Sequence, residues 1–174
     1  EPVDDATATF KAKDFAFYHD RPDGLYITCT VDPAISQRLE ADDSAIVVVG
    51  TDKELNLYLL DAVAGKLLPD QLVDTVFSLY RHWNFRTLGL ETNAFQKMLK
   101  TEIERRIAHE RNTNPHFRLF HIEEFTGTSQ LNKELRIHGL QPYHERGAIK
   151  FPGERLELLT GVWSQLAFQM LEFP

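Results

Sequence analysis

The sequence predicts an α/β fold with a mixed central sheet, in which parallel strands extend a three-strand antiparallel meander and helices lie on both faces. Three observations predict it. Three apolar, β-branched segments come first, and strands separated by helical segments follow them. The hydrophobic spacing also changes to the helical period at Pro69. Since parallel strands need long crossover connections, the second half of the chain should add its strands in parallel.

The three leading strands are expected at residues 25–31, 44–50 and 55–62. The first strand should end at Asp32, because Pro33 cannot donate a hydrogen bond to a sheet. The second strand is almost wholly apolar, so we expect it to be buried on both faces. The short polar link between the second and third strands predicts a hairpin.

The later elements follow from the same patterns. Helices are predicted at residues 69–83, 94–109, 131–137 and 156–171, and strands at residues 87–91, 117–122 and 148–151. Pro69 suits a first helical turn, Thr92 or Asn93 can cap the second helix, and Gly139 can end the third. Residues 1–24 are interpreted as an N-terminal segment that leads into one domain of residues 25–174.

Composition limits the function classes. The 174 residues suit one sizeable core, and no apolar run is long enough to span a membrane. The N-terminus has no signal-peptide pattern. The single cysteine, Cys29, excludes an internal disulfide and a cysteine-rich zinc site, and its apolar surroundings predict a buried thiol in a reducing, cytoplasmic setting. The net charge of -7 argues against a broadly basic DNA-binding surface, but a carboxylate cluster that holds divalent cations is acidic until metal binds.

Two acids occupy strand ends. Asp32 follows the first strand, and Glu91 is the last residue of the strand at residues 87–91. If these strands are parallel neighbours, the two carboxylates lie about 5 Å apart at the sheet edge where α/β folds place their ligands. Paired hard oxygen ligands suit Mg²⁺ or Mn²⁺. An acid at a strand end is more often a turn or helix-cap residue, so this spacing alone favours that role.

The surroundings of these acids resemble a known family. The segments Val31-Asp-Pro-Ala-Ile-Ser36 and Asp42-Asp-Ser-Ala-Ile-Val-Val-Val-Gly50 resemble the nuclease domain of phage terminase large subunits. Leu88-Gly-Leu-Glu-Thr-Asn-Ala-Phe-Gln96 is similar to that family's second acidic motif, in which a strand-end Glu precedes a short turn and a Gln. The resemblance continues in residues 55–64, 133–137, 140–142, 147–149 and 165–174, and it extends over roughly residues 25–174 through order and spacing.

The resemblance implies an RNase H/RuvC-like fold and a two-metal endonuclease that uses Mg²⁺ or Mn²⁺. Such an enzyme cuts double-stranded viral DNA during genome packaging in the host cell cytoplasm. Asp32 and Glu91 would be the catalytic metal ligands, and a third carboxylate is expected beyond Pro174, so the domain is expected to lack its C-terminal end. The implied partners are an upstream ATPase motor domain, the portal and the small terminase subunit. The chain contains no glycine-rich P-loop, which predicts the nuclease part alone.

Other candidate residues and functions stay open. Asp43 is a candidate outer-shell ligand or a turn residue, and Lys133 and Arg136 could contact DNA phosphates or form a solvated helix face. The histidines have no zinc-ligand spacing. Five of them are expected in loops or at the surface: His19, His116, His121, His138 and His144. A junction-resolvase or transposase-type nuclease would share the fold. A non-catalytic docking module of the packaging motor would leave the acids a structural role.

Overall fold

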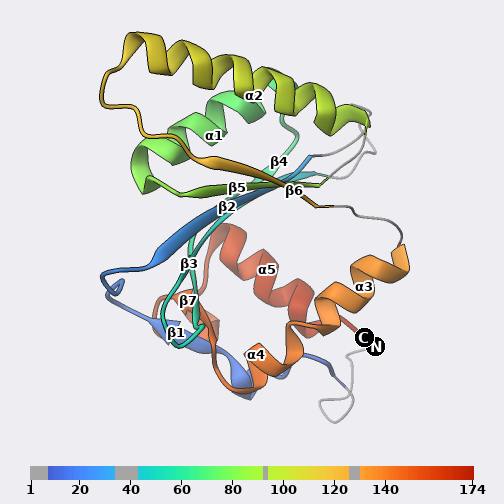
Figure 1. Ribbon diagram of the computed structural model, residues 1–174. Helices are drawn as coiled ribbons and strands as arrows, with labels where there is room; N and C mark the ends of the chain where they lie inside the picture. The colour runs from blue at the N-terminus through green and yellow to red at the C-terminus, as the bar shows by residue number, and fades with distance from the viewer. Residues whose placement is uncertain (1–7, 34–42, 92–93, 126–129) are drawn as a thin grey trace. The chain divides into compact units, whose positions relative to one another are not determined.

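The computed structural model describes residues 8–33, 43–91, 94–125 and 130–174 (Figure 1). Its strands are β1 (Ala16–Tyr18), β2 (Tyr26–Asp32), β3 (Ser44–Thr51), β4 (Leu57–Gly65), β5 (Thr87–Glu91), β6 (His121–Phe125) and β7 (Ile149–Pro152). Its helices are α1 (Pro69–Trp83), α2 (Ala94–Thr113), α3 (Gln130–His138), α4 (Gln141–Glu145) and α5 (Gly161–Leu171), with short 3₁₀ turns η1 (Ala12–Asp14) and η2 (Leu156–Leu158).

The described strands form one mixed sheet in the order β1-β7-β4-β3-β2-β5-β6. The pairs β1/β7, β4/β7, β2/β5 and β5/β6 are parallel. The strands β2, β3 and β4 are consecutive neighbours, and the link from β3 to β4 is too short for a parallel crossover, so these strands form the predicted antiparallel meander. The predicted α/β class with a mixed sheet is confirmed.

The chain divides into two compact units. The first unit comprises Glu1–Leu25, Val49–Ala62 and Thr128–Pro174, and the second comprises Tyr26–Val48 and Val63–Gly127. The strands β3 and β4 contribute residues to both. No helix in the described parts of the chain combines the length and the apolar character needed to cross a bilayer.

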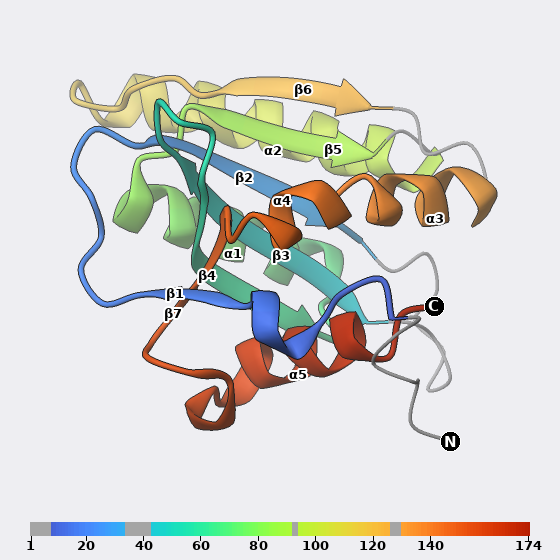
Figure 2. The same ribbon diagram turned by 90° about the horizontal axis from the view of Figure 1, so that it is seen from below.

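In the second unit, β2, β5 and β6 run side by side in the same direction, and α1 and α2 lie against one face of them (Figures 1 and 2). Alternate strand residues are buried toward these helices: Cys29, Val31, Leu88 and Leu90. An ion pair of 3.0 Å between Lys100 of α2 and Glu124 of β6 connects the helix to this face. The intervening strand residues therefore point to the opposite face.

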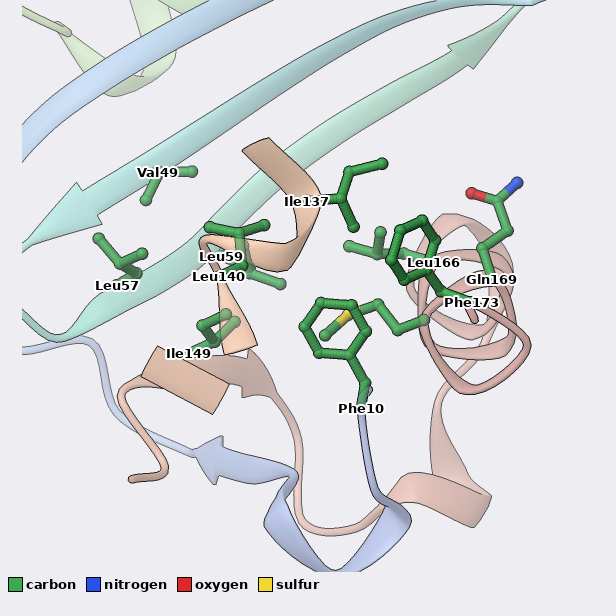
Figure 3. A pocket seen from close by; sticks show the side chains of 11 residues that line it. Phe10, Val49, Leu57, Leu59, Ile137, Leu140, Ile149, Leu166, Gln169 and Phe173 are labelled. Carbon is green, nitrogen blue, oxygen red and sulfur yellow. The ribbon is translucent and has the colours of Figure 1, made fainter. Parts of the chain in front are cut away.

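The core of the first unit lies between α5 and the strands β4, β7 and β1. Its buried cluster consists of Phe15, Leu59, Ile149, Phe151 and Ala167. Beside this cluster is an apolar cavity of about 460 Å³, with side chains from β3, β4, β7, α3, α5 and the N-terminal segment in its wall (Figure 3). Among the described residues that line the cavity, Gln169 is the one polar side chain.

One buried polar residue of the first unit contradicts the sequence prediction. His144 was expected in a loop or at the surface, but its side chain is 0% exposed. Its ring lies edge-on to Phe10 and Phe15, with centroids 5.4 and 4.7 Å away, and Nε2 is 3.0 Å from the carbonyl oxygen of Lys11. These contacts attach the N-terminal segment to α4. The histidine is buried because it carries out a packing and hydrogen-bonding role that local sequence does not reveal.

The predicted helix 69–83 and strand 87–91 match α1 and β5 at both ends. The predicted strand 117–122 is wrong in position, since β6 begins at His121. Phe117 and Phe120 instead pack around Tyr80, and the Tyr80 hydroxyl donates to the carbonyl oxygen of Arg118. This hydrogen bond uses a backbone acceptor that a strand would need.

The predicted helix 156–171 begins too early. Residues 156–158 form the turn η2, Thr160 is extended, and α5 begins at Gly161, whose φ of +58° breaks the helical path. The strand β1 and the helix α4 were not predicted. The strand β3 alternates between buried and half-buried residues and is therefore not buried on both faces. The predicted cap at Thr92 or Asn93 lies outside the described residues.

Candidate metal centre

Asp32 and Glu91 lie at the carboxyl ends of two adjacent parallel strands in the second unit. Val31 of β2 and Leu90 of β5 are register partners, so the next residues along the two strands are Asp32 and Glu91. Neighbouring strands are about 5 Å apart. The fold thus brings together two acids that are far apart in the sequence, as the strand-end argument predicted.

Both acids belong to the sheet face that α1 and α2 do not cover. Val31 and Leu90 are fully buried, whereas Asp32 is exposed and Glu91 is half-buried. Because successive strand residues alternate between faces, the two carboxylates share one face with Thr30 and Gly89. A charged pair on this accessible face keeps contact with water and with any ligand that approaches the sheet edge.

The strand β6 completes the immediate surroundings. Its register places Phe125 beside Glu91 and Glu123 beside Gly89. A Cβ atom at Gly89 would lie 3.3 Å from Cε1 of Phe125 and 3.3 Å from Oγ1 of Thr30. The side chains of Phe125 and Thr30 therefore close over the space that the glycine leaves, two residues before Glu91 on β5.

Sequence reasoning missed this arrangement around Gly89. A glycine within a short strand often marks a close approach by another group, and Gly89 precedes Glu91 by two residues. That signal was present in the sequence. It could not identify Phe125 or Thr30 as the neighbours, because their identity depends on the registers of β2 and β6.

The donor chemistry of the pair fits a hard divalent cation. Carboxylate oxygens are the ligands that Mg²⁺ and Mn²⁺ prefer, and Mg²⁺ retains several waters when proteins hold it by one or two carboxylates. In the described parts of the chain, no group of three His, Cys, Asp or Glu side chains is placed to hold a metal ion. A metal-ligand role for Asp32 and Glu91 stays a prediction, and water or a bound phosphate would have to supply the other ligands.

Asp43 lies immediately before β3, in the second unit. Its carboxylate oxygen is 3.5 Å from Nζ of Lys66, the residue after β4. Both side chains are more than half exposed, so this ion pair contributes little to stability. Because β3 runs antiparallel to β2, Asp43 is at the same end of the meander as Asp32. An outer-shell role for Asp43 stays a prediction.

Lys133 and Arg136 are exposed residues of α3, in the first unit. Their side chains have the length and charge needed to reach a phosphate, and DNA contact by them stays a prediction. The apolar cavity of the first unit offers no alternative catalytic centre, because its described lining carries no titratable side chain.

No protein-family model matches the chain, and no curated protein sequence is significantly similar to it. Solved structures are similar in fold. The magnesium-bound large terminase nuclease of the thermophilic phage G20c has a TM-score of 0.57 and 14% identity, and the alignment covers 84% of this chain and 75% of that one. The Thermus phage P74-26 large terminase nuclease domain has a TM-score of 0.57 and 15% identity, over 97% of this chain and 79% of that one.

A second structure of the G20c nuclease, with bound cobalt, has a TM-score of 0.56 and 13% identity, over 86% of this chain and 76% of that one. At these identities the likeness establishes the fold. The chain has the RNase H-like fold of phage large terminase nuclease domains, as its sequence resemblance implied.

Proposed function

We propose that the chain is the nuclease domain of a terminase large subunit, an endonuclease that cuts double-stranded viral DNA during genome packaging in the infected cell. Two independent lines support this. The sequence motifs around Asp32 and Glu91 resemble that family, and the fold is that of solved large terminase nucleases, which have been crystallised with bound magnesium and bound cobalt.

The observation that carries the proposal is the register of β2 with β5, which brings Asp32 and Glu91 together at one sheet edge. The two carboxylates would hold Mg²⁺ or Mn²⁺, with two ions in the complete centre and a third carboxylate from outside the described residues. A divalent cation at such a site acidifies bound water and offsets phosphate charge. The protein's own part is to fix the two carboxylates on rigid strands, and no side chain is required as a covalent nucleophile.

The charge of the chain suggests how DNA would reach this centre. A net charge of -7 gives weak non-specific attraction to DNA, since that attraction comes from phosphate neutralisation by Lys and Arg. Local contacts, with Lys133 and Arg136 as candidates, would position the backbone. Delivery of the duplex by the ATPase motor and the portal, with the small subunit, would supply the remaining affinity.

Plasmid cleavage tests the proposal. The wild-type protein should convert supercoiled plasmid to nicked and linear forms with Mg²⁺ or Mn²⁺, and EDTA should stop the reaction. Asp32→Asn and Glu91→Gln should each lower the rate by at least about 100-fold, because each removes a ligand charge. Asp23→Asn changes an exposed turn acid and is the matched control. Full cleavage by Asp32→Asn would overturn the assignment.

The same preparation distinguishes related functions. Linear and four-way-junction DNA of equal length should be cut at similar rates by a packaging nuclease, whereas a strong preference for the junction would identify a resolvase. Binding to a packaging partner without any metal-dependent cleavage would identify a docking module.

A further inference from the structure

Phe125 is an aromatic residue on the sheet face that carries the candidate metal centre. It is the last residue of β6, it is half-buried, and its register partner is Glu91. The register therefore places an aromatic ring one strand, or about 5 Å, from one of the two carboxylates. The neighbouring positions on this face, Thr30, Asp32 and Glu123, are polar and exposed.

The ring is turned toward β5. The atom Cε1 of Phe125 is 3.3 Å from the position that a Cβ atom of Gly89 would occupy. Aromatic residues commonly pack over a glycine on a neighbouring strand, and this contact alone would be structural. Here, however, Phe125 is also next to Glu91 and is only half-buried. The register puts this ring within reach of a sugar that adjoins a phosphodiester held by Asp32 and Glu91.

The chemistry of the ring distinguishes the two kinds of sugar. A deoxyribose presents C–H groups at its 2′ position, which pack well against an aromatic surface. A ribose presents a hydroxyl there, and this hydroxyl would lose water without gaining a partner from the ring. The nearest polar side chains on this face are those of Thr30 and Glu123. Each lies two residues earlier along its strand than Asp32 and Phe125, which is a distance of about 7 Å.

Resting on the proposed nuclease function, we propose that Phe125 is a specificity-determining residue that contacts the sugar beside the scissile phosphate and favours deoxyribose over ribose there. An apolar wall rejects an added hydroxyl by up to about 100-fold. The expected discrimination against a single ribonucleotide is therefore about 10-fold to 100-fold in kcat/KM. Gly89 contributes to this arrangement, because the absence of a side chain there leaves room for the Phe125 ring.

The test compares two duplexes that differ in a single 2′-hydroxyl group. The cut position on a short DNA duplex is mapped first, and a second duplex then carries one ribonucleotide at that position. The ratio of kcat/KM for the two duplexes is measured with Mn²⁺ for the wild type, Phe125→Leu and Phe125→Ala. Phe117→Leu changes another half-buried phenylalanine of the second unit, one that packs on Phe77 and Tyr80, and is the matched control.

The wild type and Phe117→Leu should prefer the all-deoxy duplex by about 10-fold or more, and Phe125→Ala should reduce the ratio toward one. Phe125→Leu keeps an apolar side chain and should give an intermediate ratio. If the Phe125 variants cleave too slowly, the ratio of Kd values for the same duplexes with Ca²⁺ serves as the readout, with the same expectation. An unchanged ratio in Phe125→Ala, or no discrimination by the wild type, overturns this inference while Asp32-dependent cleavage continues to support the nuclease function. A wild type without Asp32-dependent cleavage overturns both.

Discussion

Asp32 and Glu91 directly follow Val31 and Leu90, which are register partners in the parallel strands β2 and β5. Two carboxylates that leave a sheet side by side repel each other by up to about 1 kcal/mol in water, and by more where water is partly excluded. This repulsion disappears when a divalent cation binds between or beside them. The site is therefore expected to couple metal binding to the stability of the second unit.

Thermal stability should reveal this coupling. Saturating Mn²⁺, at about 100 times its Kd, should raise the Tm of the wild type by about 5–10 °C. Asp32→Asn should lose most of this rise, because one carboxylate binds a divalent cation weakly. Its metal-free Tm should rise by up to about 4 °C, because the repulsion between the two carboxylates is removed. Differential scanning fluorimetry with Mn²⁺ titration and EDTA reversal measures both. A full Mn²⁺ response in Asp32→Asn, with Asp23→Asn as control, would contradict the assignment.

The sequence predicted well those elements that local patterning determines. The helix α1 begins at Pro69 and carries buried residues at helical spacing, so both of its ends were predicted correctly. The strand β5 is bounded by polar residues and alternates between buried and half-buried positions. The juxtaposition of Asp32 with Glu91 followed from one topological assumption, that their strands are parallel neighbours, and the structure confirms that assumption.

Elements that depend on distant partners were not predictable. The strand β1 has three residues and exists through its pairing with β7, more than 130 residues later. The position of β6 depends on how Phe117 and Phe120 pack around Tyr80 of α1. The contact of Phe125 with the space at Gly89 needs the register of β5 with β6, and the long helix α2 separates these strands in the sequence.

The hairpin between β3 and β4 should weaken at acidic pH. Partial loss of water raises the pKa of Asp52. Hydrogen bonds from Asn56, Glu54 and Tyr58 together lower the pKa by a larger amount, so it lies below its ordinary value of 3.8. A carboxylate with a depressed folded-state pKa stabilises the fold above its unfolded pKa. This contribution is lost as the pH falls through the folded-state value.

Asp52→Asn tests this hairpin. It should lower the Tm at neutral pH, since an amide nitrogen would replace one acceptor oxygen facing the donors of Asn56 and Tyr58. The difference in Tm from the wild type should shrink as the pH falls from about 7 to about 2.5. Circular dichroism melts across this range measure it. Glu54→Gln is the control, and a difference that stays constant with pH would refute the role of the Asp52 charge.

Gly89 and Phe125 should be energetically coupled. A methyl group at Gly89 would lie 3.3 Å from both the Phe125 ring and the Thr30 hydroxyl. Overpacking of this kind costs about 1–3 kcal/mol, which exceeds the gain of at most about 1 kcal/mol from restricting the unfolded glycine. Gly89→Ala should therefore lower the free energy of unfolding. The loss should shrink in a Phe125→Ala background, where the contact with Thr30 alone remains.

A double-mutant cycle in urea measures this coupling, which should reach about 1 kcal/mol. The matched cycle of Gly89→Ala with Phe117→Ala should give additive effects, because Phe117 packs on Phe77 and Tyr80 of the helix layer. Additivity in the Phe125 cycle would mean that the ring does not occupy the space at Gly89.

Within the first unit, His144 should hold the N-terminal segment against α4. Its ring fills the space between Phe10 and Phe15, and Nε2 hydrogen-bonds to the carbonyl oxygen of Lys11, which requires that nitrogen to carry the proton and donate. Within the described residues, the buried Nδ1 has no hydrogen-bond partner. The residue is therefore held by packing and by one backbone contact.

His144→Ala should lower the free energy of unfolding by about 2–4 kcal/mol, through the void that it leaves and the lost hydrogen bond. Local opening of the segment around Lys11 should be favoured more than global unfolding. The segment loses its contact with His144, while the Phe15–Phe151 contact remains. Limited trypsin digestion under native conditions should then cleave after Lys11 and Lys13 at least about 10-fold faster than in the wild type. Glu145→Ala, at the exposed neighbouring position, should leave the cleavage rate unchanged. Equal cleavage rates in His144→Ala and the wild type would show that other contacts hold the segment, and that His144 stabilises α4 alone.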